Sequence, residues 1–133
     1  MLSLRLNWGN VFIDDPTWDQ VVQAIKASKK NSLAVTIENK VAGNPGVIYL
    51  MLEVDEDIGV FHPGLLLNPI GTRFFENING SAELIEFNGS DISTGTVTDD
   101  MATVLRLAKE FYETGDVKEM KSWDELFFNI KKD

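Results

Sequence analysis

The stretch VIYLMLEVDEDIGVFH, residues 47–62, decides the fold class. Its first eight residues are apolar at neighbouring as well as alternating positions, which predicts a central strand covered on both faces for part of its length. The acidic residues 55–57 predict a tight turn, and residues 58–62 predict the return strand. Because parallel strands need a long crossover, so short a connection indicates antiparallel pairing.

Two further strands are predicted on the N-terminal side of this hairpin. LSLRLNW at 2–8 and SLAVTIE at 32–38 alternate apolar and polar residues, the pattern of a half-buried strand. Between them, DDPTWDQVVQAIKASKK at 14–30 has helical periodicity. Either Asp14 or Asp15 is expected to cap this helix.

Turn residues lie on both sides of the hairpin. VAGNPG at 41–46, just before the hairpin, and PGLLLNPIGT at 63–72 are interrupted by Pro and Gly, so we expect a turn and an irregular segment there. AELIEF at 82–87 lies between two Asn-Gly pairs, at 79–80 and 88–89. Asn-Gly favours hairpin turns, so 82–87 is predicted to be a strand.

The last helix has the clearest pattern in the chain. Thr98 is expected to cap it, and Gly115 to end it in the left-handed conformation. Seven apolar residues at helical spacing form one stripe: Met101, Val104, Leu105, Leu107, Ala108, Phe111 and Tyr112. The tail SWDELFFNI at 122–130 is too apolar to stay loose, and we expect it to pack on the domain.

These elements predict one α+β domain over residues 1–133. We expect an antiparallel or mixed sheet of about five or six strands with two main helices. The chain carries 21 acidic and 12 basic residues, and residues 31–98 contain nine of the acids but only Lys40 and Arg73 as bases. Nucleic-acid binding is therefore not expected. Such acidity keeps a protein soluble, and it also attracts a basic partner.

The sequence carries little catalytic chemistry. It has no cysteine and a single histidine, His62, so thiolate sites and multi-histidine metal sites are excluded. We find no Gly-rich phosphate loop, and EVDEDIG at 53–59 departs from the ligand spacing of a calcium loop. We therefore predict no catalytic residue, metal or cofactor. A carboxylate-based hydrolase stays open as an alternative, since paired acids are common here.

The densest acidic stretch is the predicted contact site. Asp55, Glu56 and Asp57 form it, and Glu83 and Glu86 are the weaker candidates. The plain alternative is a solvated turn. No targeting segment is visible, and the longest apolar run is far shorter than the roughly 20 residues that span a bilayer. We expect a cytoplasmic protein that does not bind membranes.

Residues 97–123, VTDDMATVLRLAKEFYETGDVKEMKSW, carry a family resemblance. The stretch is similar to the C-terminal signature of a family of immunity proteins from bacterial polymorphic-toxin systems. The matching positions are Ala108, Glu110, Phe111, Thr114, Gly115 and Trp123. The preceding ELIEFNGSD and the early TWDQVVQAI also resemble that family.

The resemblance implies a non-enzymatic protein that binds a cognate toxin domain with a basic surface and occludes its active site. Members of the family inhibit deaminase-type and other toxins, so a toxin acting on nucleic acid is the expected partner. The matching positions have structural roles and do not mark the contact surface. The alternative function is a small non-enzymatic ligand-binding or adaptor domain that uses the irregular segment 63–72.

Overall fold

The computed structural model describes residues 3–31, 33–39, 47–68 and 71–126 of the 133 residues. Within these ranges the chain forms two α-helices, α1 (Trp18–Asn31) and α2 (Met101–Thr114), two short 3-10 helices, η2 (Thr94–Thr96) and η3 (Trp123–Glu125), and nine strands. The strands are β1 (Leu4–Trp8), β2 (Val11–Asp14), β3 (Val35–Asn39), β4 (Val47–Asp55), β5 (Val60–Asn68), β6 (Gly71–Phe74), β7 (Leu84–Phe87), β8 (Ser90–Ser93) and β9 (Lys121–Ser122).

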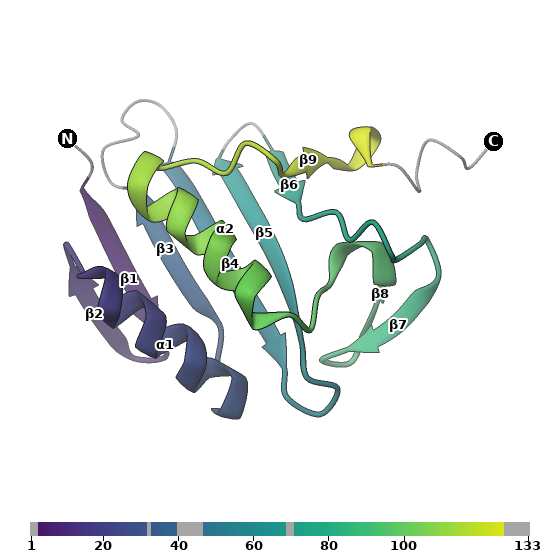
Figure 1. The fold of residues 1–133 in the computed structure, drawn as a ribbon, viewed down its shortest axis with the longest axis horizontal. Helices are drawn as coiled ribbons and strands as arrows, with labels where there is room; N and C mark the ends of the chain where they lie inside the picture. Colours follow the sequence, from purple (N-terminus) through teal and green to yellow (C-terminus); the bar gives the residue numbers. More distant parts are fainter. Residues whose placement is uncertain (1–2, 32, 40–46, 69–70, 127–133) are drawn as a thin grey trace.

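Seven of the described strands form one antiparallel sheet in the order β2-β1-β3-β4-β5-β6-β9, and β7 and β8 form a separate hairpin. Every strand pair in the sheet is antiparallel. Both α-helices lie on the same side of the sheet, and the β7–β8 hairpin lies beside the start of β5 (Figure 1). The predicted α+β class with two main helices is confirmed, and the edge strands β2 and β9 raise the strand number above the expected five or six.

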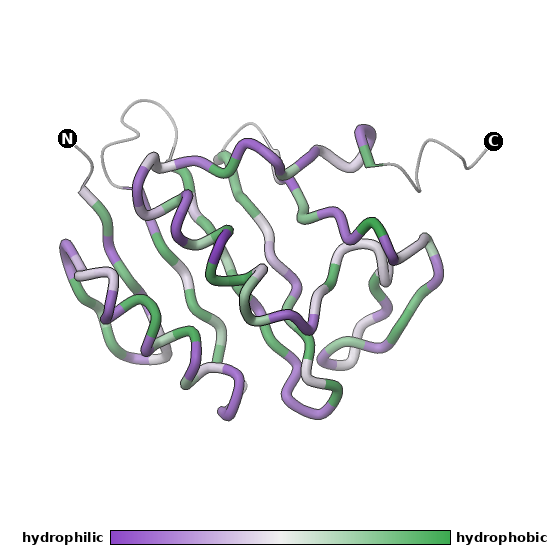
Figure 2. Tube along the Cα trace, viewed as in Figure 1, coloured by the Kyte–Doolittle hydropathy of each residue, from purple (hydrophilic) through white to green (hydrophobic). Residues whose placement is uncertain are grey.

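The core lies between the helices and the face of the sheet that they cover. Strand residues Leu6, Ile37, Leu50, Leu52 and Leu65 are all buried there. Residues from both helices complete it: Val21, Ala24, Ile25, Val104, Leu107, Ala108 and Phe111. Figure 2 shows the hydrophobic positions recurring along the strands and on parts of both helices. Each such buried large side chain contributes about 1.5 to 3 kcal/mol.

Contacts between the helices fix their ends. The ring centroids of Trp18 and Tyr112 are 5.5 Å apart, and Lys109 Nζ lies 5.0 Å from the Trp18 ring centroid. The hydroxyl of Tyr112 donates a 2.9 Å hydrogen bond to the carbonyl of Pro16. The aromatic and cation–π contacts together hold the start of α1 against the end of α2.

The expected cap of α1 is wrong. Thr17 caps this helix, because its hydroxyl accepts from the Gln20 N–H at 3.1 Å while the Gln20 side chain accepts from the Thr17 N–H at 2.9 Å. This reciprocal pair is a capping box. Asp14 instead ends β2 and accepts a 3.0 Å hydrogen bond from Arg5, and Asp15 lies between the strand and the helix.

The start of α2 also differs from expectation by two residues, whereas its end does not. Asp100 is the N-cap and accepts from the Ala102 N–H at 3.1 Å. Thr98 is held in an extended position by two backbone bonds to Phe61. Gly115 ends the helix with φ of 78° and donates its N–H to the Phe111 carbonyl, as predicted.

The expectation of an irregular segment at 63–72 is wrong, because β5 runs through Pro63 and pairs with β4 along its whole length. The Pro63 carbonyl accepts from the Phe75 N–H at 3.4 Å, on the side that faces β6. The nitrogen of Pro63 points to that same side, so its missing N–H removes no bond to β4. The predicted turn at 41–46 lies outside the described residues.

The C-terminal tail packs on the sheet as far as it is described. Leu126 is fully buried, and the Trp123 ring meets the Phe74 ring edge-on with centroids 5.7 Å apart. The apolar residues 127–130, which were expected to join this packing, lie outside the described residues. None of the described helices is long and apolar enough to cross a membrane.

Candidate partner-binding surface

The predicted acidic turn joins β4 to β5, and its first member has a structural role. Asp55 is buried, with 8% of its surface exposed. Its Oδ1 accepts from the Asp57 N–H at 2.9 Å and its Oδ2 from the Asn88 N–H at 2.8 Å. Both carboxylate oxygens therefore hold backbone in place. Glu56 and Asp57 are exposed in the turn.

The Asn88 contact joins this turn to the tip of the β7–β8 hairpin. Asn88 and Gly89 form the two-residue turn of that hairpin with φ of 48° and 84°, the backbone that Asn-Gly favours. The Asn88 side-chain amide also donates to the Val54 carbonyl at 3.1 Å. Two acidic segments that are far apart in the sequence thus lie side by side.

The two weaker candidates lie at different ends of β7. Glu86 is exposed and pairs across the hairpin with Asp91. Glu83 precedes the strand and its carbonyl accepts from the Thr94 N–H at 2.9 Å. Three residues of strand separate Glu83 from Glu86, which is about 10 Å. Glu86 therefore lies near the acidic turn, whereas Glu83 lies at the far end of the hairpin.

Asp91 is an acidic residue of this surface that the sequence analysis missed. Directly paired residues of an antiparallel hairpin project from the same face, so the Glu86 and Asp91 carboxylates are neighbours. The signal was present in the sequence, because a two-residue Asn-Gly turn at 88–89 sets residue 86 opposite residue 91. We define the acidic end of the molecule by Glu56, Asp57, Glu86 and Asp91.

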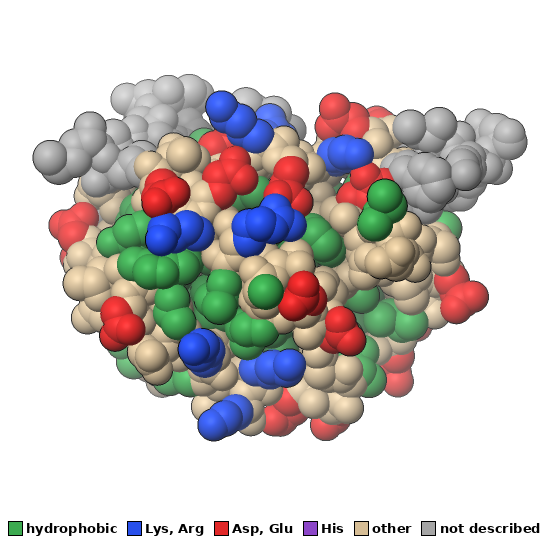
Figure 3. Space-filling model, viewed as in Figure 1, with side chains coloured by type: hydrophobic (Ala, Val, Ile, Leu, Met, Phe, Trp, Pro, Cys, Tyr) green, Lys and Arg blue, Asp and Glu red, His purple; other side chains and the backbone are tan. Residues whose placement is uncertain are grey.

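Basic side chains lie away from the acidic end. No Lys or Arg occurs between Lys40 and Arg73 or between Arg73 and Arg106. In Figure 3 basic side chains lie over the two helices and along the edge near β6 and β9, whereas the side that carries β7 and β8 shows only acidic ones among its charged groups. The potential at this end is therefore negative, which favours approach of a basic surface.

His62 packs beside this end, between two aromatic rings. Its Nδ1 lies 3.1 Å from the Thr96 carbonyl oxygen, and its ring centroid lies 6.0 Å from that of Phe74 and 5.7 Å from that of Phe87. Burial lowers its pKa below the ordinary value, and the Thr96 carbonyl and the Glu53 carboxylate partly oppose that change. The described part of the chain holds no group of three or more His, Asp or Glu side chains placed to bind a metal.

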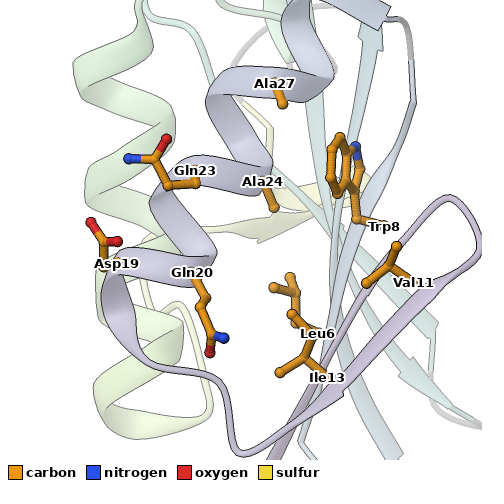
Figure 4. A pocket seen from close by; sticks show the side chains of 9 residues that line it. All are labelled: Leu6, Trp8, Val11, Ile13, Asp19, Gln20, Gln23, Ala24 and Ala27. Carbon is orange, nitrogen blue, oxygen red and sulfur yellow. The ribbon is translucent and has the colours of Figure 1, made fainter.

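A separate cavity of about 350 Å³ lies between α1 and the β1–β2 hairpin (Figure 4). Its walls are mostly apolar, and its polar rim comes from the exposed side of α1. The lining residues are Leu6, Trp8, Val11, Ile13, Asp19, Gln20, Gln23, Ala24 and Ala27. This volume is within the range of small-molecule sites. The cavity is not in segment 63–72, where the sequence analysis expected a ligand to bind.

Comparison with protein-family models gives no match, and comparison with curated protein sequences gives none either. Among solved structures, the chain is similar to the crystal structure of a hypothetical protein from Neisseria gonorrhoeae, with a TM-score of 0.65 and 11% sequence identity. The match covers 88% of this chain and 91% of that one. At this identity the likeness shows that the two proteins share a fold.

Proposed function

We propose that the chain is an immunity protein that binds one cognate toxin domain and blocks its active site. The observation that supports this most directly is the joining of two acidic segments through Asp55 and Asn88. The proposed partner acts on nucleic acid, a polyanion, so its active site needs a basic surface. An acidic inhibitor imitates the phosphates of that substrate and associates rapidly.

The pairing of Glu86 with Asp91 adds to this support. Like charges directly opposite each other weaken a hairpin by a few tenths of a kcal/mol. A Lys or Arg side chain of the partner placed between the two carboxylates reverses that cost. A charge pattern that is unfavourable in the free protein is thus favourable in a complex with a basic surface.

The proposal is tested by purifying the tagged full chain from its own bacterium at low salt and identifying the proteins that bind to it. We expect a stoichiometric partner with a toxin domain whose toxicity this chain suppresses. Recovery of the chain alone, from cells shown to produce a candidate toxin, contradicts the proposal.

Charge reversal then tests the contact site. Lys at Glu56, Asp57, Glu86 and Glu83 is expected to weaken toxin binding, with the smallest loss at Glu83. Asp55 is left unchanged, because its side chain holds the turn. Glu113→Lys, on the exposed side of α2, is the matched control. Affinity of the native complex is expected to fall as added salt shortens the Debye length from about 10 Å to about 3 Å.

The cavity beside α1 supports a second candidate function, the binding of a small apolar molecule. Its volume and its apolar walls suit such a ligand. Saturable stabilisation of the chain by a small molecule, together with the absence of a toxin partner, is the result that favours this function over the first.

A further inference from the structure

The face of the sheet that points away from the helices is not typical of a solvent-facing sheet surface. Residues alternate between the two faces along each strand, and the helices cover Leu50 and Leu52 of β4. Tyr49 and Met51 therefore project from the opposite face, which we call the open face. Antiparallel sheets are usually polar on the face that is left to water.

Strand β4 was expected to be covered on both sides for part of its length because it is apolar at successive positions. In the structure both helices lie on one side of it (Figure 1). On the other side Tyr49, Met51 and Glu53 are half-buried, whereas Asp55 is buried and bonded to the tip of the β7–β8 hairpin. The second side is therefore covered at this end of the strand, where Asn88 contacts Asp55 and the Phe87 ring centroid lies 5.7 Å from that of His62. Tyr49 and Met51, nearer the middle of the strand, are only half-buried.

Register places Phe12, Met51 and Phe74 in one row across the strands of the open face, with the polar pair Asn7 and Thr36 between Phe12 and Met51. Phe12 pairs with Asn7, Thr36 with Met51, and Gly64 with both Met51 and Phe74. Phe12 at one end of the row is 63% exposed. At the other end Trp123, which is 44% exposed, contacts the Phe74 ring. Aromatic and Met side chains are enriched where proteins bind one another.

Gly64 lies in the middle of this row and is buried. It is a glycine inside a strand, and its φ is not in the left-handed region. A Cβ at this position would meet only the Arg73 carbonyl oxygen and Leu66 Cδ1, both at 4.0 Å. Internal packing therefore does not require glycine here. Because Gly64 is buried, its neighbours already cover its backbone.

The charges of the open face are complementary to a basic partner. Register places two basic residues there, and each is ion-paired within the chain: Arg5 to Asp14 at 3.0 Å and Lys121 to Glu76 at 2.6 Å. Glu38, which lies directly opposite Arg5, and Glu53 add negative charge to the same face. Glu53 lies two residues before Asp55, so the negative charge continues from the face into the acidic turn.

We propose that the toxin domain docks on the open face, and this inference rests on the proposed function. Apolar side chains of the toxin pack against Met51 and Phe74 of this face. Basic residues of the toxin face Glu38, Glu53 and the acidic end. The apolar row supplies binding energy at the centre, and the carboxylates around it supply orientation and rapid encounter.

Carboxylate labelling of the wild-type complex tests the placement without any substitution. A carbodiimide with an amine probe modifies accessible Asp and Glu side chains, and mass spectrometry reads the extent at each. Toxin binding is expected to protect Glu38 and Glu53 and to leave Asp19 of α1 and Glu113 of α2 unchanged. Protection of the helix carboxylates instead overturns the inference and leaves the proposed function standing.

A pair of variants gives an independent test of the same placement. Met51→Arg adds a positive charge to the open face, and Gln23→Arg adds the same side chain to the exposed side of α1. We expect the first to weaken toxin binding by about tenfold or more and the second by less than about twofold. Thermal unfolding of both variants checks that each is folded. If Met51→Arg does not fold, the carboxylate labelling of the wild-type complex alone tests the docking face.

The outcomes separate the two proposals. If the chain neutralises a toxin but the complex protects the helix carboxylates, only the docking face is contradicted. The same holds if Met51→Arg and Gln23→Arg change the affinity for the toxin equally. Failure to find any toxin that the chain neutralises contradicts the immunity function, and the docking inference is then overturned with it.

Discussion

The Asn88 backbone N–H donates a 2.8 Å hydrogen bond to Oδ2 of Asp55, across 33 residues of sequence. The bond holds the tip of the β7–β8 hairpin against the β4–β5 turn. Because the Asp55 carboxylate is buried and also accepts from the Asp57 N–H, its removal leaves two backbone donors without their acceptor. Asp55 therefore shapes the acidic end, while its neighbours in the turn present their charge to solvent.

Asp55→Ala is accordingly expected to lower the free energy of unfolding by about 1.5 to 3 kcal/mol, the range for hydrogen bonds to a charged group. Urea unfolding followed by circular dichroism measures this change. Asp57→Ala is the matched control, since the Asp57 side chain is exposed, and its effect is expected to stay within about 0.5 kcal/mol. Equal losses in the two variants would show that Asp55 has no special structural role.

Substitution by alanine is expected to affect stability differently at Gly80 and at Gly64. A Cβ on Gly80 would lie 2.4 Å from the Thr94 carbonyl oxygen and 2.7 Å from Gly95 Cα, both of them backbone atoms. Gly80→Ala is expected to cost about 1 to 3 kcal/mol or more, because the loop has to move. Gly64→Ala meets nothing closer than 4.0 Å and is expected to be neutral or to stabilise by up to about 1 kcal/mol.

Thermal unfolding of the two alanine variants checks this contrast. The positions share the same chemistry, so a difference between them reports the space around each Cβ. A Gly80→Ala protein as stable as the native chain would mean that the backbone approach between residue 80 and residues 94–95 is looser than described.

Local signals in the sequence were sufficient for most of the elements. The Gly115 cap, the apolar stripe of α2 and the Asn-Gly turn at 88–89 each depend on a few neighbouring residues, and each was predicted. The cap of α1 was missed although its signal is also local. Thr17 and Gln20 have the spacing of a capping box, but the two aspartates before them are equally good caps by residue type.

The features that the sequence analysis did not predict depend on long-range contacts. By residue type Pro63 is expected to interrupt a strand. It is tolerated in β5 because its nitrogen faces the side where β6 ends, so no hydrogen bond to β4 is lost. In the sequence Asp55 is one of three adjacent acidic residues in the predicted turn, and nothing there sets it apart. Only its contact with Asn88 in the structure distinguishes it. The acidic candidates Glu56, Asp57 and Glu86 were brought near one another by that same contact, whereas Glu83 was not.

His62 is expected to make stability depend on pH. Its folded-state pKa is lowered from the ordinary value of 6.5, chiefly by burial, so between the two values the unfolded chain binds more protons. Stability is then fully present above about pH 6.5 and is lost as the pH falls from there toward the folded-state pKa. Equilibrium unfolding measured across this window is expected to show the decline.

The His62→Gln variant isolates this effect, because Gln does not titrate while the carboxylates remain. The difference in unfolding free energy between native and variant chains is expected to shrink or change sign as the pH is lowered. A difference that stays constant through the window would mean that the His62 pKa is the same in the folded and unfolded chains.

Filling the cavity beside α1 is expected to stabilise the protein. Ala27 lies on its wall, and the Ala27→Leu side chain enters a space walled by Leu6 and Trp8. Cavity filling commonly adds about 0.5 to 2 kcal/mol, so the thermal midpoint should rise. Gln23→Leu, at the rim, is the control, because its side chain gains less apolar contact. A fall in stability for Ala27→Leu would show that the space is too narrow for the added carbons. If the chain binds a small apolar molecule here, the same variant removes that binding and leaves toxin binding unchanged.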